Sequence, residues 1–359
     1  MFPRINIDLN KLKQNLDWLT THCHERGIEV AVVTKVFCAD SEICKVIEKS
    51  DADLYADSRI QNLDKIKTTK PKQLLRIPMQ SEIERVVRSA DISMQSSIET
   101  IRLSGEAARE LGRRHKVILM VDLGDLREGI FNTDEDQILS AARTVLEFSS
   151  LELYGIGANL TCYGGILPDS QNLGRLLEIA QMIRKKFNIA LPVVSGGNSS
   201  MMSMLKNDEI PNGITQLRLG ESFALGNDTS TGLPMQELNT DCFILEAELV
   251  EIQKKPSKPI GKSGLNAFGE KVSFEDRGEM IRGILAVGRQ DVNPDGLSCL
   301  DEQVELLGAS SDHLIVNLTS CDRKYSVGDT LKFIPDYGCL LKIMTSEYVH
   351  RSYPGKNVF

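Results

Sequence analysis

The chain has 359 residues, of which 41% are hydrophobic and 26% are charged, and its formal net charge is −8. This length can bury a large core, and the composition is that of a globular protein. The negative net charge gives no electrostatic footprint for nucleic acid or for an anionic membrane surface. We therefore expect a protein that acts on a small molecule.

The sequence leads us to expect neither a targeting signal nor a metal site. Residues 1–8 contain no apolar run behind a basic start, and no later stretch approaches a membrane span, so we expect a cytoplasmic protein. The eight cysteines form no CxxC pair, which is typical of free thiols. His22, Cys23 and His24 point in different directions near the end of an expected helix, so no metal site is expected.

Short β-rich runs alternate with helical stretches from residue 28 to residue 228. The expected strands are Val30–Thr34, Asp53–Ala56, Gln73–Ile77, Ile92–Met94, Lys116–Asp122, Glu152–Asn159, Pro192–Ser195 and Gln216–Leu219. The expected helices include Ser41–Glu48, Ser58–Lys65, Ser97–Leu111, Asp134–Phe148 and Asn172–Lys186. About eight βα units in about 200 residues predict an α/β fold, a (β/α)8 TIM barrel over residues 8–228. The alternative, a doubly wound sheet, favours a glycine-rich turn after its first strand, where this chain has Lys35-Val36-Phe37.

The pattern changes after residue 228, where helical periodicity becomes rare. Alternating or β-rich runs are separated there by Gly, Pro, Asn and Asp: Phe243–Glu251, Ile281–Val287, Gln303–Leu307, Leu314–Leu318 and Thr330–Ile334. We therefore expect a C-terminal all-β domain over residues 229–359. Residues 1–7 are β-like as well, and we expect them to join this domain as a strand.

Lys35 follows the apolar run 28–34 at the carboxyl end of the first expected barrel strand. Stiff β-branched neighbours can hold such a lysine partly out of water, which frees the amine to form a Schiff base. From position alone, the alternative is an ordinary strand-end lysine in water.

Further candidate residues follow the later expected strands. Residues 195–200 read SGGNSS and residues 218–222 read RLGES; these are the loops where barrel enzymes commonly hold a phosphate, and their glycines let backbone amides approach an anion. Arg127 follows strand five, and Asn159 and Cys162 follow strand six. For each loop the alternative is a plain turn or a solvated residue, but together they place two arginines, an amide and an anion site around Lys35.

This constellation resembles the alanine racemase family, barrel enzymes dependent on pyridoxal 5'-phosphate (PLP), over nearly the whole chain. The resemblance implies that Lys35 in AVVTKVFCAD carries the cofactor, that Arg127 in VDLGDLREG lies near its phenolic oxygen, and that Arg218 in LRLGES faces its pyridine nitrogen. The other implied cofactor contacts are Asn159, Asn198, Ser199, Ser200, Gly220, Glu221 and Tyr337. The run GASSDHLIVN resembles a family segment bearing an aspartate, here Asp312, which we expect to bind substrate.

Two departures from the family pattern are informative. Alanine racemases carry a G-Y-A-D-G motif whose tyrosine serves as the second catalytic base in the partner subunit's site, whereas residues 288–291 here read GRQD. Residues 37–40 read FCAD and lack the tyrosine expected on the phosphate side. The combination is more similar to the ornithine racemase branch of the family than to alanine racemase itself.

The resemblance implies an amino acid racemase that works as a homodimer with active sites at the interface. Lys35 is expected to remove the α-proton on one face, and the base on the opposite face is open among Cys162, Asp291 and His313. Ornithine is the expected substrate, with alanine, lysine or a broad range as alternatives. Its distal ammonium could meet Asp291, Asp312 or Glu221.

Two other functions share parts of this pattern. A noncatalytic PLP carrier resembles the barrel but lacks the β-domain, so the extra residues after 228 argue against it. A barrel-type aldolase or amino acid decarboxylase would keep Lys35, but a decarboxylase typically has an acidic partner for the ring nitrogen, so Arg218 argues against it.

Overall fold

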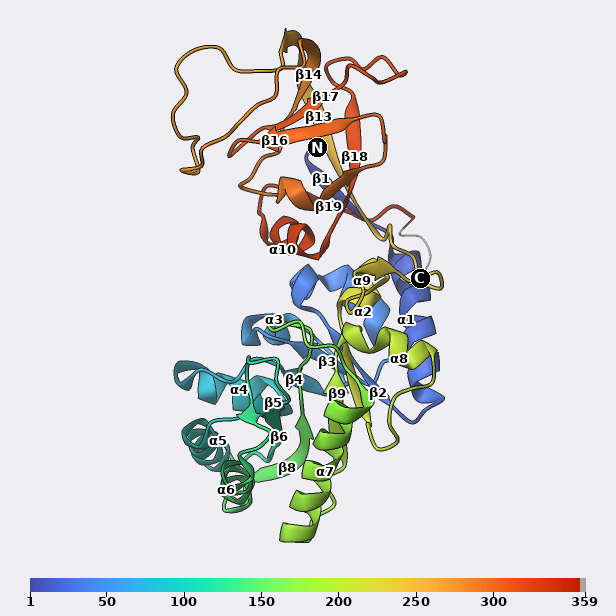
Figure 1. Ribbon diagram of the computed structural model, residues 1–359. Coiled ribbons are helices and arrows are strands. Elements are labelled where there is room, and N and C mark those ends of the chain that lie inside the picture. Colours follow the sequence, from blue (N-terminus) through green and yellow to red (C-terminus); the bar gives the residue numbers. More distant parts are fainter. Residues whose placement is uncertain (356–359) are drawn as a thin grey trace. The chain divides into compact units, whose positions relative to one another are not determined.

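A computed structural model describes residues 1–355, and the chain divides into two compact units. The barrel unit is Asn10–Thr240, and the β unit is Met1–Leu9 together with the chain from Asp241 onward (Figure 1). Residues 229–240 therefore lie with the barrel unit, whereas the expected boundary was at 228. Among the described residues, no helix has both the length and the apolar character needed to cross a membrane.

Eight parallel strands close into a ring in the barrel unit. They are β2 (Glu29–Val33), β3 (Leu54–Asp57), β4 (Lys72–Leu74), β5 (Ile92–Gln95), β6 (His115–Asp122), β8 (Leu151–Gly157), β9 (Val193–Gly197) and β10 (Gln216–Leu219). Their order is β5-β4-β3-β2-β10-β9-β8-β6, and β5 also pairs with β6. The expected (β/α)8 barrel is confirmed.

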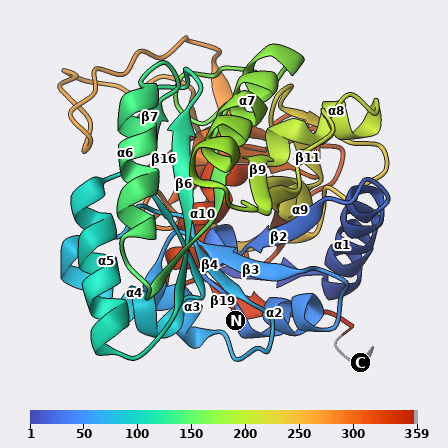
Figure 2. The same cartoon turned by 90° about the horizontal axis from the view of Figure 1, so that it is seen from below.

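Helices surround these strands, as Figure 2 shows. They are α1 (Leu9–His24), α2 (Ser41–Glu48), α3 (Ile60–Lys65), α4 (Ile83–Ser89), α5 (Ile98–Glu110), α6 (Glu135–Leu146), α7 (Ser170–Phe187), α8 (Met202–Lys206) and α9 (Glu221–Leu225). Side chains that accept backbone amides set several starts: Asp40 caps α2, Ser97 caps α5 and Asp134 caps α6. Shorter elements are η1 (Lys35–Phe37), η2 (Gln80–Glu82), η3 (Ser199–Met201), β7 (Ile130–Phe131), β11 (Asn227–Asp228) and β12 (Leu233–Pro234).

Alternate strand positions fill the barrel with apolar side chains. The buried cluster is Ala31, Val33, Leu54, Ala56, Ile92, Met94, Ile118, Met120 and Val193. Because side chains alternate along a strand, Val30 and Val32 face the opposite way from Ala31 and Val33. The packed interior gives the loops at the strand ends a rigid base.

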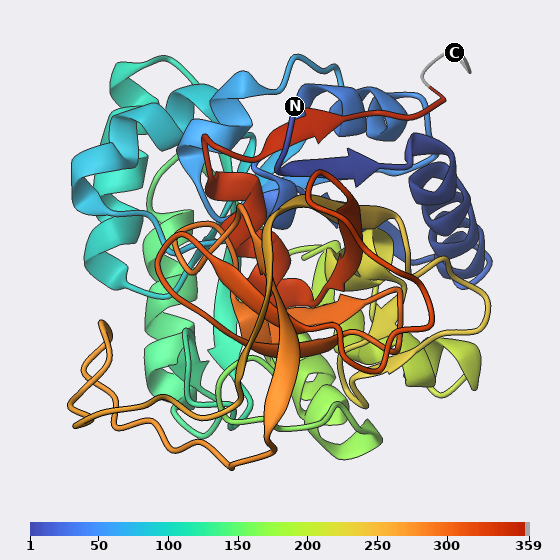
Figure 3. The ribbon, with the colours of Figure 1, turned by 90° about the horizontal axis from the view of Figure 1, so that it is seen from above.

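The β unit is a sheet with one short helix (Figure 3). Its elements are β1 (Arg4–Ile7), β13 (Phe243–Pro256), β14 (Glu279–Leu285), η4 (Pro294–Gly296), β15 (Leu297–Cys299), β16 (Glu305–Ala309), β17 (Leu314–Asn317), β18 (Thr330–Pro335), α10 (Tyr337–Thr345) and β19 (His350–Ser352). The expected C-terminal β-rich region is confirmed, and β1 pairs with β13 and β19. Helix α10 was not expected; Asp336 caps it by accepting the Cys339 amide at 2.7 Å.

Glu246 on β13 is a buried carboxylate that fastens β1 to this sheet. It accepts a hydrogen bond from Arg4 Nε at 2.7 Å, and Lys332 Nζ lies 3.2 Å away. Burial raises the pKa of Glu246, but Arg4 and Lys332 together outweigh burial and hold the pKa below its ordinary value.

The substitution Glu246→Gln should lower the free energy of unfolding by about 1.5–3 kcal/mol at neutral pH, because charge-assisted hydrogen bonds are lost. Since the folded-state pKa is lowered, this stabilisation is present above the unfolded-state pKa of about 4.3 and is lost as the pH falls. Urea unfolding at pH 7 and near pH 4 measures both effects. A difference between variant and wild type that is the same at both pH values would contradict this role.

Candidate active site

The candidate site lies at the carboxyl ends of the barrel strands, where barrel enzymes build their active sites. Lys35 begins η1 directly after β2, and Arg218 lies within β10. The other candidates in this unit are Arg127 after β6, Asn159 and Cys162 after β8, Asn198, Ser199 and Ser200 after β9, and Gly220 and Glu221 after β10. The loops thus bring to one end of the barrel residues that are far apart in the sequence.

Thr34 and Asp57 hold the backbone from which Lys35 extends. Both residues are fully buried, and Thr34 Oγ1 donates to Asp57 Oδ2 at 2.6 Å. Burial raises the pKa of Asp57, while the Thr34 bond and the charge of Lys35 act in the opposite direction. Beyond Lys35, Cys38 and Ala39 have φ of 53° and 52°, a left-handed conformation that is costly for residues other than glycine. The surrounding packing must hold this turn in place.

The loop that carries Arg127 folds back onto the end of β6. Asp122 Oδ1 accepts the backbone amides of Gly124 at 2.8 Å and Leu126 at 3.2 Å. Gly129 has φ of 128°, and a Cβ there would lie 2.5 Å from the backbone nitrogen of Asp122. The D-x-G-x-x-R-x-G spacing is therefore required by the backbone of the loop. This backbone leaves Arg127 at the rim, with 40% of its side chain exposed.

Glu128 joins the loops after β6 and β8. Its Oε1 accepts a hydrogen bond from Arg127 Nη2 at 2.6 Å and another from Asn159 Nδ2. For Arg127, burial lowers the pKa, but the bond to Glu128 and the charges of Cys162, Glu128 and Asp125 together outweigh burial, and the net change is upward. The sequence analysis missed Glu128, because its place in the motif carries no signal of a contact with Asn159, 31 residues away.

Arg218 is the buried cation of the site, with 2% exposure. Nη1 donates to Ser195 Oγ at 2.5 Å and Ser195 O at 3.2 Å, and Nη2 donates to Ala158 O at 2.6 Å and Asn159 Oδ1 at 2.5 Å. Burial lowers the pKa of Arg218 to about 10, so it stays cationic at neutral pH. Within the described part of the chain, the Nε–H of Arg218 makes no hydrogen bond.

Asp125 clamps the loop that carries Cys162. This carboxylate is 1% exposed; its Oδ2 accepts the amides of Cys162 at 3.1 Å and Tyr163 at 2.9 Å, and its Oδ1 accepts the amide of Ile166 at 3.2 Å. Thr161, just before Cys162, has φ of 58°. Asp125 thus fixes a strained loop, and sequence reasoning missed this role because the contact spans 37 residues.

The Cys162 thiol lies among polar groups of the site. Its sulfur accepts a hydrogen bond from Asn198 Nδ2 at 3.3 Å. Although Cys162 is exposed as a residue, protein atoms around the sulfur raise the pKa of the thiol, and the charges of Arg127 and Arg218 partly offset this rise. The thiol is therefore mainly protonated at neutral pH.

The loops after β9 and β10 meet through Ser199. Ser199 Oγ accepts the backbone amides of Gly220 at 3.4 Å and Ser222 at 3.1 Å and lies 3.0 Å from Ser222 Oγ. Asn198 Oδ1 accepts the Ser200 amide at 2.9 Å. Among residues 1–355, the buried Ser200 Oγ has no hydrogen-bond partner, so it can bind a further oxygen.

The remaining candidates lie in the β unit. Asp291 is 5% exposed and accepts a hydrogen bond from Ser346 Oγ at 2.6 Å. Asp312 and His313 are exposed before β17, and Tyr337 begins α10.

Comparison with known proteins identifies the family. Residues 7–226 match the family model of the alanine racemase N-terminal domain. The chain belongs to the alanine racemase family. It is 46% identical over 352 residues to ornithine racemase of Acetoanaerobium sticklandii, covering 98% of this chain and 99% of that one. It is 38% identical over 356 residues to lysine racemase of Thermotoga maritima, again covering 98% and 99%.

Solved structures of alanine racemases share the fold. The crystal structure of alanine racemase from Bartonella henselae with covalently bound pyridoxal phosphate has a TM-score of 0.72 at 18% identity, covering 98% of this chain and 99% of that one. The expected family and its ornithine racemase branch are confirmed by the family match and by the 46% identity to an ornithine racemase.

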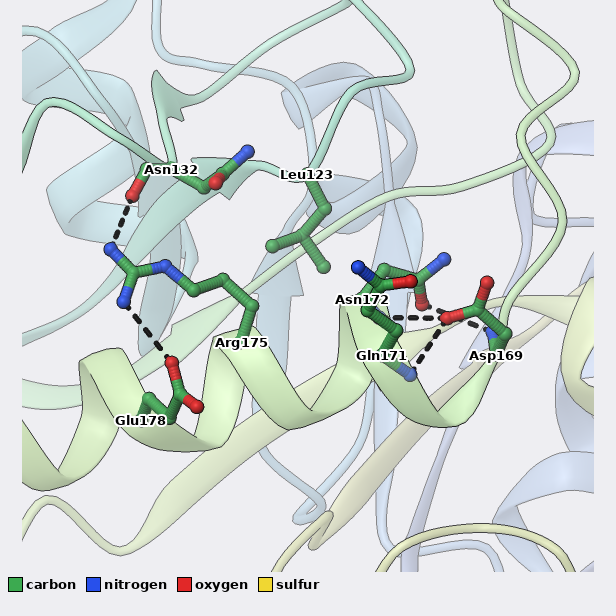
Figure 4. A pocket seen from close by; sticks show the side chains of 7 residues that line it. All are labelled: Leu123, Asn132, Asp169, Gln171, Asn172, Arg175 and Glu178. Carbon is green, nitrogen blue, oxygen red and sulfur yellow. Dashed lines mark hydrogen bonds and ion pairs between the residues drawn. The ribbon is translucent and has the colours of Figure 1, made fainter.

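A separate pocket of about 440 Å³ lies at the N-terminal end of α7 (Figure 4). Asp169 already accepts the amides of Gln171 at 2.8 Å and Asn172 at 2.7 Å, and Arg175 donates to Asn132 O at 2.8 Å. Because Asp169 and Arg175 are already bonded to these partners, the pocket is a weaker candidate than the barrel mouth, where the buried Ser200 Oγ lacks a partner among the described residues.

The substitution Asp125→Ala should loosen the loop 160–166 without unfolding the barrel. Three backbone amides lose a carboxylate acceptor, each bond being worth about 1.5–3 kcal/mol, so their hydrogen exchange should accelerate by about tenfold or more. Exchange measured by mass spectrometry on peptides covering this loop tests the expectation. Asp136→Ala, which removes an exposed carboxylate on α6, is the control; equal exchange in both variants would refute the clamp.

Proposed function

We propose that this protein is a PLP-dependent amino acid racemase whose preferred substrate is ornithine. The observation that carries the proposal is the placement of Lys35 at the end of β2 beside β10, which bears a buried Arg218 with one uncommitted N–H. The 46% identity to an ornithine racemase supports the substrate, and the 38% identity to a lysine racemase makes lysine the alternative.

The residues at the barrel mouth fit PLP. Ser200 Oγ is a buried hydroxyl that lacks a partner among the described residues, and a phosphate oxygen would supply one. We place the phosphate at residues 198–200 and 220–221, the ring nitrogen at Arg218 and the phenolic oxygen at Arg127. In this proposal, Asp312 is a substrate-binding residue and Tyr337 a phosphate-binding residue, as the family pattern implies.

The bound cofactor would supply a conjugated ring that accepts the negative charge developing on the substrate α-carbon. Lys35 would take the α-proton on one face of the substrate. Arg218 is a cation with donors and no acceptor, so it would donate to the ring nitrogen and would not favour a protonated ring. This arrangement suits inversion of the α-carbon over side reactions such as transamination.

Cys162 is our assignment for the base on the opposite face. It lies on the same barrel rim as Lys35, on a loop that Asp125 holds, with its thiol beside Asn198. Asp291, in contrast, is buried and bonded to Ser346, and His313 is an exposed residue before β17. Because the pKa of Cys162 is raised, the rate in the direction that needs its thiolate should keep rising above pH 8.5.

We also propose that the enzyme is a homodimer, because alanine racemases place the β-domain of one subunit over the barrel mouth of the other. A cytoplasmic location is part of the proposal, since the eight cysteines are free thiols.

Purified protein reconstituted with PLP should invert D- and L-ornithine faster than lysine, alanine or serine, followed by loss of optical activity. Lys35→Ala should abolish both inversion and the visible absorbance of the bound cofactor. Lys45→Ala, an exposed lysine on α2, is the matched control and should retain both. Absorbance without inversion of any amino acid would favour the noncatalytic carrier, and release of CO2 would favour a decarboxylase.

Mixing inactive variants tests the shared site and the second base together. Cys162→Ser should lower racemisation about 10²–10⁴-fold, and mixing it with Lys35→Ala should restore nothing, because both residues belong to one barrel. If Asp291 or His313 were the base, mixing Asp291→Asn or His313→Gln with Lys35→Ala would restore about a quarter of wild-type activity in hybrid dimers. If Asp291→Asn or His313→Gln is inactive alone and regains racemisation on mixing with Lys35→Ala, the assignment to Cys162 is overturned.

A further inference from the structure

The geometry points to Glu128 as a positioning residue that ties Arg127 and the Asn159–Arg218 pair into one hydrogen-bonded frame. The inference rests on the proposed function, because these are the two arginines that would face the cofactor.

Glu128 is the point where two loops of the barrel mouth meet. One carboxylate oxygen, Oε1, accepts from Arg127 Nη2 at 2.6 Å and from Asn159 Nδ2, and the other oxygen accepts from Arg127 Nε. The bidentate pair with Arg127 fixes the plane of that guanidinium. Arg127 is 40% exposed and Glu128 is 21% exposed, so without this pair the Arg127 side chain would be free to turn toward solvent.

The carboxylate also decides which way the Asn159 amide points. Asn159 Oδ1 accepts from Arg218 Nη2 at 2.5 Å, which leaves Nδ2 to find an acceptor. Glu128 supplies that acceptor. With the amide so oriented, Asn159 binds the Nη2 edge of Arg218, and the Nε–H stays available to a ring nitrogen.

Glu128 further balances charge at the barrel mouth. Arg218 is buried, and its four hydrogen-bond acceptors, from Ser195, Ala158 and Asn159, are all neutral. The charges of Glu128 and Arg127 act on Arg218 in opposite directions, Glu128 favouring its charged form and Arg127 opposing it. Removing the charge of Glu128 would leave two guanidinium groups facing the cofactor with less compensation.

The substitution Glu128→Gln tests this role, because glutamine keeps the size and an acceptor oxygen but removes the charge. The visible absorbance of Lys35-bound PLP changes with pH as the nitrogen that links them loses its proton. Uncompensated positive charge disfavours that proton, so the midpoint of the absorbance titration should fall by about one pH unit. The kcat for racemisation should fall about tenfold or more, while KM changes by less than about threefold.

Two variants serve as controls. Glu128→Asp keeps the charge on a shorter side chain, so its midpoint should stay within about 0.3 units of wild type while kcat falls. Glu135→Gln removes a carboxylate that pairs with Arg175 at 2.6 Å on α7, and it should match wild type in both measurements. A Glu128→Gln midpoint within about 0.2 units of wild type would overturn the inference.

A measurement on the cofactor-free protein separates this inference from the proposed function. Glu128→Gln, Asn159→Ala and the double variant should show non-additive shifts in Tm, the double variant losing less than the sum of the single variants. Additive shifts would overturn the positioning role. A wild-type protein with no visible absorbance after incubation with PLP would refute the proposed function. The Tm shifts of the two single variants and the double variant would still decide the role of Glu128.

Discussion

Burial of the Arg218 guanidinium in the barrel wall is the constraint on which the rest of the candidate site depends. A buried cation without partners is costly, so Ser195, Ala158 and Asn159 must direct oxygens at it. The register between β10 and β2 places Arg218 opposite Ala31, on the strand that leads to Lys35. Strand β10 also pairs with β9, which leads into the loop of Ser199 and Ser200. One strand thus links the proposed cofactor anchor, ring-nitrogen contact and phosphate loop.

Buried carboxylates stabilise loop conformations that the backbone does not prefer by itself. Asp122 and Asp125 each accept backbone amides, and Leu126 and Thr161 lie in left-handed conformations nearby. Such conformations persist where surrounding contacts hold them, and here they lie next to Arg127 and Cys162. The site is therefore built mainly from side chain to backbone bonds, above which Glu128 adds a direct link between side chains of two loops.

Much of this arrangement could be predicted from the sequence. Alternating apolar runs and capping residues located the barrel strands and most of the helices, because both signals are local. The position of Lys35 after the first strand and the Gly/Ser loops after the last two placed candidates at one end of the barrel. Glu128 and Asp125 were missed, since their contacts join residues 31 and 37 positions apart and neither residue type is unusual in a loop. Helix α10 was missed because it lies among β-rich runs.

By itself, the sequence determined the family, the barrel with its β-rich partner unit, and Lys35 as the candidate anchor, because periodicity and motif spacing are properties of neighbouring residues. Only the tertiary structure decided which donors and acceptors are already committed. The orientation of the Asn159 amide, the open Nε–H of Arg218 and the partnerless hydroxyl of Ser200 depend on side chains from separate strands meeting at fixed distances. Such contacts arise from the closure of the barrel, which no local pattern encodes.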